Sequence, residues 1–256
     1  MGLRMVISNQ HRFIFIKTAK TAGTSIEAFL SPHCGPDDVF TTTRPPVDGH
    51  EPRNWKKAFF PLKEFFSFNY PVDKSVYNER RFFTPMLTFN DMRKRRKFHE
   101  HLPARIAKMR IDPEIWNSYH KFAVERNPWD KTLSHYHMQK AFRDGKLTLD
   151  EYFDEGVFCQ NTGFYLDQNG ECMVDEIIKY ENLAEGIGGI CERFGIPFEG
   201  SLGVRAKSDY RKDHTHYSKV LEKRHLEVID RVYRKEIDMH GYVFEDPSED
   251  RSTTTE

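Results

Sequence analysis

The chain has 256 residues, its 39 Lys and Arg balance 39 Asp and Glu, and 38% of its residues are hydrophobic. Such a composition supplies a large apolar core and indicates a globular protein. The zero formal net charge excludes a protein whose whole surface binds duplex nucleic acid, because that function requires an excess of Lys and Arg facing phosphates.

No apolar run approaches the roughly 20 residues that cross a bilayer, and Phe13–Ile16 is too short for the core of a signal peptide. We therefore expect a cytoplasmic protein without a membrane span. The four cysteines are Cys34, Cys159, Cys172 and Cys191. They form no Cys-x-x-Cys pair and are too few for a disulfide framework, so we predict free thiols and no structural zinc.

The first predicted strand is Phe13–Ile16, a continuous apolar run typical of a strand buried on both faces of a parallel sheet. A turn of small residues follows. Apolar side chains then repeat at helical spacing over residues 26–30. Thr24 and Ser25 can cap the start of this helix, and Pro32 ends it.

Prolines and scattered aromatic residues break the chain between Val39 and about Arg110. We expect an irregular excursion over the sheet here, with residues 40–100 shaping the acceptor pocket. The basic run at residues 93–97 is read either as a solvated helix face or as a contact with an anionic substrate. Nuclear targeting or nucleic-acid contact is the third reading.

A second strand is predicted over residues 121–125. Asn127 is a good N-cap for the helix that follows, and Pro128 suits its first position. A third strand over residues 174–180 precedes a helix with apolar repeats from Leu183 to Phe194, which Gly195 closes.

Near the end of the chain, residues 226–237 predict one long amphipathic helix that stops at Gly241. Residues 246–256 have nothing to bury and are predicted to be disordered. The alternation of strands and helices predicts an α/β fold, a three-layer P-loop-like arrangement with a central parallel sheet flanked by helices. We expect one domain over residues 1–245, with its ligand beyond the carboxyl ends of the strands.

The loop between the first strand and its helix is the clearest candidate for an anion site, because backbone N–H groups and the helix dipole converge there. Its residues are Lys20, Thr21, Ala22, Gly23, Thr24 and Ser25. Small residues allow close approach, Lys20 adds a mobile charge, and the last two add hydroxyls. An ordinary tight turn with a solvated lysine is the alternative. The Walker pattern is absent, which disfavours a nucleoside triphosphatase.

This loop resembles the 5′-phosphosulfate loop of sulfotransferases that use 3′-phosphoadenosine 5′-phosphosulfate (PAPS), whose core is commonly Pro-Lys-Thr-x-x-Thr-Ser. Ala19 replaces the usual proline, a departure that affects stiffness more than chemistry. The family's second element, Arg-Asn-Pro-x-Asp-x-x-x-Ser-x-Tyr, is matched by Arg126, Asn127, Pro128, Asp130, Ser134 and Tyr136. In the family this element binds the 3′-phosphate.

The second element also makes sense chemically. Arg126, at the carboxyl end of a strand, can fork onto a phosphate, and Ser134 lies about two turns along the same helix face as Asn127. The alternative is that Arg126 pairs structurally with Asp130 or Glu125.

Further stretches extend the resemblance, which covers residues 11–30 and about 100–245 and points to the carbohydrate branch of the family. Residues 178–183 resemble its Tyr-Glu-Asp/Asn-Leu segment, and residues 233–244 resemble its closing helix. Arg205, Lys207 and Arg211 stand where the family often has a basic loop over the nucleotide. We expect them to bind it, with a solvated loop as the alternative.

The resemblance implies sulfuryl transfer from PAPS, without a required metal, to an acceptor hydroxyl of a glycan or of a small hydroxyl compound. Lys20 would stabilise charge on the departing phosphate oxygen. His101 is the first choice for the general base, with His50 and His99 as rivals. A kinase-like phosphoryl transferase and a non-catalytic nucleotide-binding module are the alternative functions.

Overall fold

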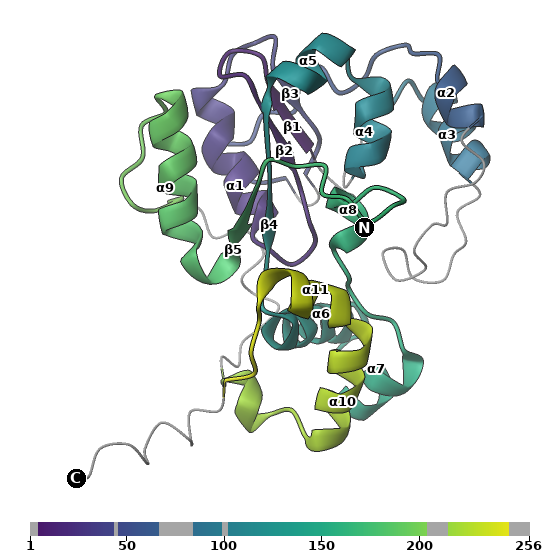
Figure 1. Ribbon diagram of the computed structural model, residues 1–256, viewed down its shortest axis with the longest axis vertical. Helices are drawn as coiled ribbons and strands as arrows, with labels where there is room; N and C mark the ends of the chain where they lie inside the picture. Colours follow the sequence, from purple (N-terminus) through teal and green to yellow (C-terminus); the bar gives the residue numbers. More distant parts are fainter. Residues whose placement is uncertain (1–4, 44–45, 67–83, 99–101, 204–214, 246–256) are drawn as a thin grey trace.

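The computed structural model describes residues 5–43, 46–66, 84–98, 102–203 and 215–245. Its central element is a five-stranded sheet in the order β3-β1-β2-β4-β5. The strands are β1 (Met5–Ser8), β2 (Phe13–Ile16), β3 (Val39–Phe40), β4 (His120–Glu125) and β5 (Glu176–Lys179). Helices lie on both faces of this sheet, which confirms the predicted α/β class (Figure 1).

Strand direction departs from the prediction at β1. Strands β2, β4 and β5 are parallel, but β1 is antiparallel to both β2 and β3. Only residues 9–12 join β1 to β2, and so short a connection permits a hairpin but no parallel crossover. The predicted central parallel sheet is therefore confirmed for β2, β4 and β5, while β1 makes the sheet mixed. The parallel pairing of β2 with β4 still places their carboxyl ends at one edge of the sheet.

The helices fall into three groups around the sheet (Figure 1). On one face lie α1 (Gly23–Leu30) and α9 (Leu183–Phe194). Toward the other lie α2 (Leu62–Phe66), α3 (Thr84–Arg93), α4 (Ala104–Arg110), α5 (Pro113–Ser118) and α8 (Thr162–Tyr165). Beyond the carboxyl ends of the strands lie α6 (Pro128–Phe142), α7 (Leu149–Glu155), α10 (Lys223–Val232) and α11 (Arg234–His240).

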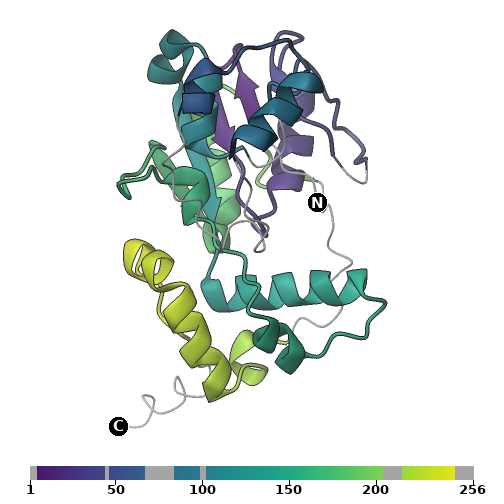
Figure 2. The same ribbon diagram turned by 90° about the vertical axis from the view of Figure 1, so that its right-hand side faces the viewer.

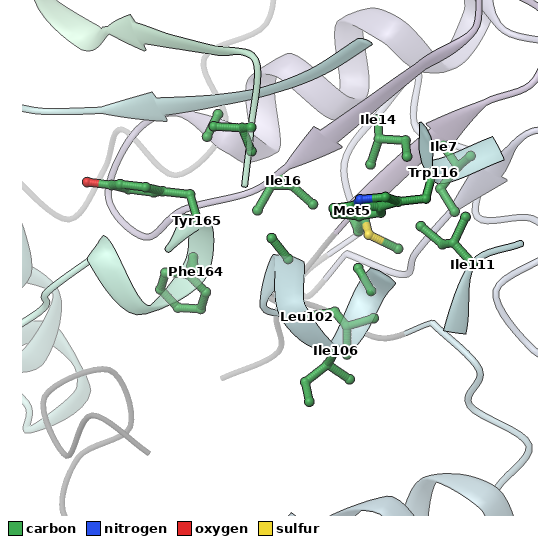
Figure 3. Close-up of a cluster of buried hydrophobic side chains, with 14 of the residues drawn as sticks. Met5, Ile7, Ile14, Ile16, Leu102, Ile106, Ile111, Trp116, Phe164 and Tyr165 are labelled. Carbon is green, nitrogen blue, oxygen red and sulfur yellow. The ribbon is translucent and has the colours of Figure 1, made fainter. Parts of the chain in front are cut away.

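The apolar run of β2 is continuous because both of its faces are buried. Phe13 and Phe15 pack with α1 and α9. Ile14 and Ile16 point to the opposite face, where Ile106 of α4 lies in the same cluster (Figure 3). The predicted strand buried on both sides is thus confirmed, and the period of two along a strand explains which side chain goes where.

A separate apolar cluster holds the group of helices beyond the strand ends. Trp129 and Leu133 of α6 share it with Tyr152 of α7 and Ile229 of α10. Figure 2 shows α6 lying across the molecule below the sheet, with α7 and α10 on its far side. One face of α6 therefore serves this cluster, while its N-terminus follows directly from β4.

Several predicted boundaries are confirmed and others are corrected. Asn127 caps α6 through its side chain, α9 spans the predicted residues, and α11 ends at Gly241 in a left-handed conformation. The long helix predicted over residues 226–237 breaks at Tyr233 into α10 and α11. The stretch from Val39 to Arg110 is more regular than predicted, since it contains β3, α2, α3 and α4.

All four cysteines are free thiols, as predicted. Among the described residues no helix combines the length and apolar character needed to cross a membrane. The predicted disordered tail at residues 246–256 lies outside the described residues.

Candidate functional site

The loop that joins β2 to α1 has an unusual backbone. Lys20 and Ala22 both adopt left-handed conformations, with φ of 64° and 56°. Alternation of left-handed and ordinary residues turns successive N–H groups toward one side, which is how backbone nests bind anions. Positive φ is costly for residues other than glycine, so this conformation is held by its surroundings.

Helix α1 starts from this loop without a side-chain cap. Ala22 is the N-cap residue, and it makes no side-chain cap hydrogen bond. The prediction that Thr24 and Ser25 cap the helix is wrong, because both lie inside its first turn and are buried. Two N–H groups at this end of the helix, those of Ser25 and Ile26, donate to the carbonyl oxygen of Ala22 at 2.8 and 3.1 Å.

A buried lysine lies beneath the loop. The Nζ atom of Lys17 is 2.8 Å from Glu27 Oε2 and donates to Thr24 Oγ1 at 3.2 Å. The side chain of Lys17 is 5% exposed and that of Glu27 is fully buried. Sequence reasoning missed this pair because Lys17 follows an apolar strand and looks like an ordinary polar end.

Hydroxyl groups tie the loop to the neighbouring strand. Thr18 Oγ1 donates to the carbonyl oxygen of Val124 in β4, and its oxygen lies 2.8 Å from Thr21 Oγ1. Both threonines are buried. Thr21, predicted to line the anion site, therefore helps to anchor the loop from below.

The side chain of Lys20 reaches toward α6. Its Nζ is 3.6 Å from Met138 Sδ, and the side chain is half-buried. His135, also on α6, is buried and shares a 2.8 Å hydrogen bond between its Nδ1 and the Tyr152 hydroxyl. Burial, with a smaller contribution from the charge of Lys20, lowers the pKa of His135 to about 3. His135 is thus a neutral imidazole near Lys20.

Arg126 meets the loop from the end of β4. Its Nη1 donates to the carbonyl oxygen of Lys20 at 3.0 Å, while Nε and Nη2 both donate to Asp130 Oδ2. The guanidinium lies 4.1 Å from the centre of the Tyr180 ring. The pairing with Asp130 that the sequence offered as an alternative is therefore present, and the same arginine also touches the loop.

The remaining predicted site residues are distributed as follows. Ser134 is half-buried on α6. His50 packs edge-on against Phe40, and its neighbour Glu51 donates from its N–H to Ser31 Oγ, beyond the C-terminal end of α1. That end is opposite to the loop. Five predicted residues lie outside the described residues: His99, His101, Arg205, Lys207 and Arg211.

A buried polar network stands directly behind Arg126. Lys131 of α6 lies 2.8 Å from Glu125 Oε1 and 3.3 Å from Glu236 Oε1, and all three side chains are at most 1% exposed. Asn161 donates from Nδ2 to Glu125 at 3.0 Å, and the Tyr165 hydroxyl donates to Glu125 at 2.9 Å. The network joins β4, α6 and α11, and sequence periodicity contains no signal for it.

The two carboxyl groups of this network, those of Glu125 and Glu236, have pKa values shifted in opposite directions. Burial alone would raise the pKa of Glu125, but the charge and hydrogen bond of Lys131 outweigh it and lower that pKa. Burial raises the pKa of Glu236 to about 7, since Lys131 is more distant from it and Glu125 repels its ionised form. Within the described ranges, no group of three or more His, Cys, Asp and Glu side chains is arranged to hold a metal ion.

Comparison with known proteins gives one informative match. No protein-family model matches the chain, and no solved structure matches it significantly. A protein of Archaeoglobus fulgidus, named as uncharacterised, is 31% identical in an alignment of 118 residues that covers 43% of this chain and 98% of the archaeal protein. Because the match spans almost the whole archaeal protein at this identity, the chain belongs to the same family as that uncharacterised protein.

Proposed function

We propose that the chain is a PAPS-dependent sulfotransferase that transfers a sulfuryl group to a hydroxyl of a carbohydrate. The observation that carries the proposal is the contact between the two motifs, in which Arg126 Nη1 donates to the carbonyl oxygen of Lys20 at 3.0 Å. Residues 106 positions apart thus meet at the carboxyl ends of adjacent parallel strands, the usual place for a ligand in such sheets.

The loop suits the 5′-phosphosulfate end of the donor. Its left-handed residues, Lys20 and Ala22, and the uncapped start of α1 together present backbone N–H groups to an anion. Gly23 has no side chain, and a Cβ atom there would collide with the buried side chain of Lys17 under the loop. A bound anion would accept hydrogen bonds from N–H groups at this end of the helix.

Arg126 suits the 3′-phosphate. Its contacts with Asp130, the Lys20 carbonyl and the Tyr180 ring fix the plane of the guanidinium. Those three hydrogen bonds use Nε–H and one N–H on each terminal nitrogen, and a guanidinium has five N–H donors, so one on each of Nη1 and Nη2 remains for a phosphate.

In the proposed reaction the sulfuryl group passes directly from donor to acceptor, and the protein forms no covalent bond to it. PAPS supplies a sulfuryl group whose bond to a phosphate oxygen breaks as a new bond to the acceptor oxygen forms. Lys20 would stabilise the charge left on the phosphate oxygen, an interaction stronger in the transition state than before it. The acceptor proton must pass to a base, and His101 stays the prediction for that role.

Nucleotide binding gives the first test. Thermal unfolding is measured with adenosine 3′,5′-bisphosphate (PAP), with ADP, and with ATP plus magnesium. At 100 times its dissociation constant a ligand stabilises a fold by about 2.7 kcal/mol, which raises the melting temperature of a chain this long by about 5 to 10 °C. We expect that rise with PAP. Stabilisation by ATP and magnesium alone would instead support a phosphoryl transferase.

Lys20→Ala gives the second test. We expect turnover of labelled sulfate from PAPS to a panel of glycans and small alcohols to fall about 100-fold to 1,000-fold, because one preorganised donor at the breaking bond is lost. Lys108→Ala, an exposed lysine on α4, is the matched control and should keep full activity. Undiminished turnover in Lys20→Ala would contradict the mechanism, and PAP binding without transfer to any acceptor would favour a non-catalytic module.

A further inference from the structure

The loop between β2 and α1 is hydrogen-bonded at Ala19 by Asn161, a residue 142 positions away in the sequence. Asn161 Oδ1 accepts from the backbone N–H of Ala19 at 2.9 Å, and its Nδ2 donates to the carbonyl oxygen of Ala19 at 3.1 Å. One side-chain amide thus pairs with both backbone groups of one residue. Nδ2 also donates to Glu125 at 3.0 Å, so this buried amide uses both of its N–H donors and accepts one hydrogen bond at Oδ1.

Asn161 does not perform the local task that its position would suggest. It is the N-cap residue of α8, and asparagine is among the best side chains for capping a helix. Yet its side chain makes no capping hydrogen bond to α8. The amide serves the loop at Ala19 instead, while the backbone N–H of Asn161 donates to Glu236 Oε1.

We propose that Asn161 is a positioning residue for the phosphate loop and takes the place of the proline that the resembling loops carry where this chain has Ala19. Proline fixes φ and offers no N–H. Ala19 lacks the ring that would fix φ. Its backbone N–H and C=O are instead held by hydrogen bonds to the side chain of Asn161. We call the pair of hydrogen bonds between Asn161 and Ala19 the clamp. The identity of the ligand rests on the proposed function, whereas the clamp itself is present without a ligand.

The clamp matters because the strained residue is next to it. Lys20 follows Ala19 directly and has φ of 64°. Fixing the peptide groups of Ala19 limits how Lys20 can relax toward ordinary backbone angles, and therefore holds the loop N–H groups and the lysine in the anion-binding arrangement. Glu125 Oε1, held by Lys131 at 2.8 Å, accepts in turn from Asn161 Nδ2 at 3.0 Å.

The first experiment compares Asn161→Ala with Tyr165→Phe. Tyr165→Phe removes a different hydrogen bond to Glu125 and leaves Ala19 untouched, so it is the matched control for damage to the network. Amide hydrogen exchange of residues 18–25 is measured without ligand. We expect about a tenfold loss of protection at Ala19 in Asn161→Ala, the effect of one lost hydrogen bond, and none beyond the global change in Tyr165→Phe.

The second readout is affinity for PAP. We expect Asn161→Ala to bind about tenfold more weakly, and Tyr165→Phe to bind as the parent does. If the parent chain binds no PAP, the proposed function fails while the exchange result still decides the clamp. If PAP binds the parent and the asparagine variant equally and Ala19 stays protected, the clamp is refuted.

Ala19→Pro supplies a reciprocal test. In the parent, proline removes the N–H and leaves Asn161 Oδ1 without its donor, so PAP affinity should fall. In the Asn161→Ala background the proline restrains φ by itself, so affinity should rise above that of the single asparagine variant. The same effect of proline in both backgrounds would overturn the proposal. Should Asn161→Ala fail to fold, unweakened PAP binding by the single Ala19→Pro variant would also refute it.

Discussion

Lys17 shows how one buried residue determines what its neighbours can be. Its ammonium group is held by Glu27 and Thr24, which fixes the aliphatic chain across the start of α1. A Cβ atom on Gly23 would lie 2.5 Å from Lys17 Cε and 2.6 Å from its Cγ. Glycine is therefore needed there for space, since its φ is not in the left-handed range.

Gly23→Ala should destabilise the fold by about 1–3 kcal/mol, because the added methyl group must push Lys17 from a buried ion pair or distort the loop. Gly35→Ala is the control, as its Cβ would meet only the end of the Gln10 side chain. Chemical denaturation of both variants measures the difference. A Gly23 variant as stable as the Gly35 variant would show that Lys17 moves freely.

At the scale of elements, α9 packs very closely on β5. Gly186 lies where a Cβ would be 2.3 Å from Ile178 Cγ2 and 3.1 Å from its Cγ1. Ile178 is buried in the same cluster as Ile187 and Ile190 of α9. The missing side chain lets the helix approach the strand, so this glycine sets the distance between the two elements.

Two glycines of the same helix give opposite predictions. Gly186→Ala should cost about 1–3 kcal/mol through overpacking against Ile178. Gly189→Ala has no atom within 4 Å of the new Cβ and should stabilise the fold by about 0.5–1 kcal/mol through helix propensity. Urea denaturation of the pair tests both signs at once, and equal effects would contradict the packing described.

At the scale of the whole molecule, the network of Glu125, Lys131 and Glu236 joins the sheet to the helices beyond it. One ammonium group serves two carboxylates, so one negative charge is in excess when both are ionised. Burial raises the pKa of Glu236 to about 7 from an ordinary value of 4.5. Between these values the folded chain holds a proton that the unfolded chain has released.

Stability contributed by the protonated Glu236 is complete below pH 4.5 and is lost as pH rises through about 7. Glu236→Gln removes this dependence. The free energy of unfolding of the variant, relative to the parent, should therefore increase by up to about 3 kcal/mol between pH 5 and pH 8. Denaturation at several pH values measures it, and a constant difference would show that Glu236 is already ionised.

Two histidines, buried His135 and half-buried His240, affect the pH dependence of stability in the opposite sense to Glu236. Burial lowers the pKa of both His135 and His240, so their contribution to stability increases as pH rises toward their ordinary value of 6.5. Both histidines are present in Glu236→Gln and in the parent, so the difference in free energy of unfolding between the two at each pH cancels their contribution. The pH dependence of the parent alone would combine the effects of Glu236 and the histidines.

Periodicity and capping chemistry by themselves predicted the elements that carry the two motifs. The apolar run of β2, the cap of Asn127 on α6 and the apolar repeat of α9 are local patterns, and local patterns can be read from one segment at a time. The direction of β1 and the break at Tyr233 were not predicted, because strand pairing and helix bending depend on neighbours that the sequence does not order.

What the sequence alone determined was which residues begin and end the loop between β2 and α1, and which arginine follows β4. Only the tertiary structure decided that Arg126 touches Lys20, that Lys17 is buried with Glu27, and that Asn161 grips Ala19. Each of these contacts joins segments through hydrogen-bonding geometry, which leaves no periodic trace. The residues of the loop between β2 and α1 can therefore be recognised in the sequence. The contacts that hold this loop form only when distant segments fold together.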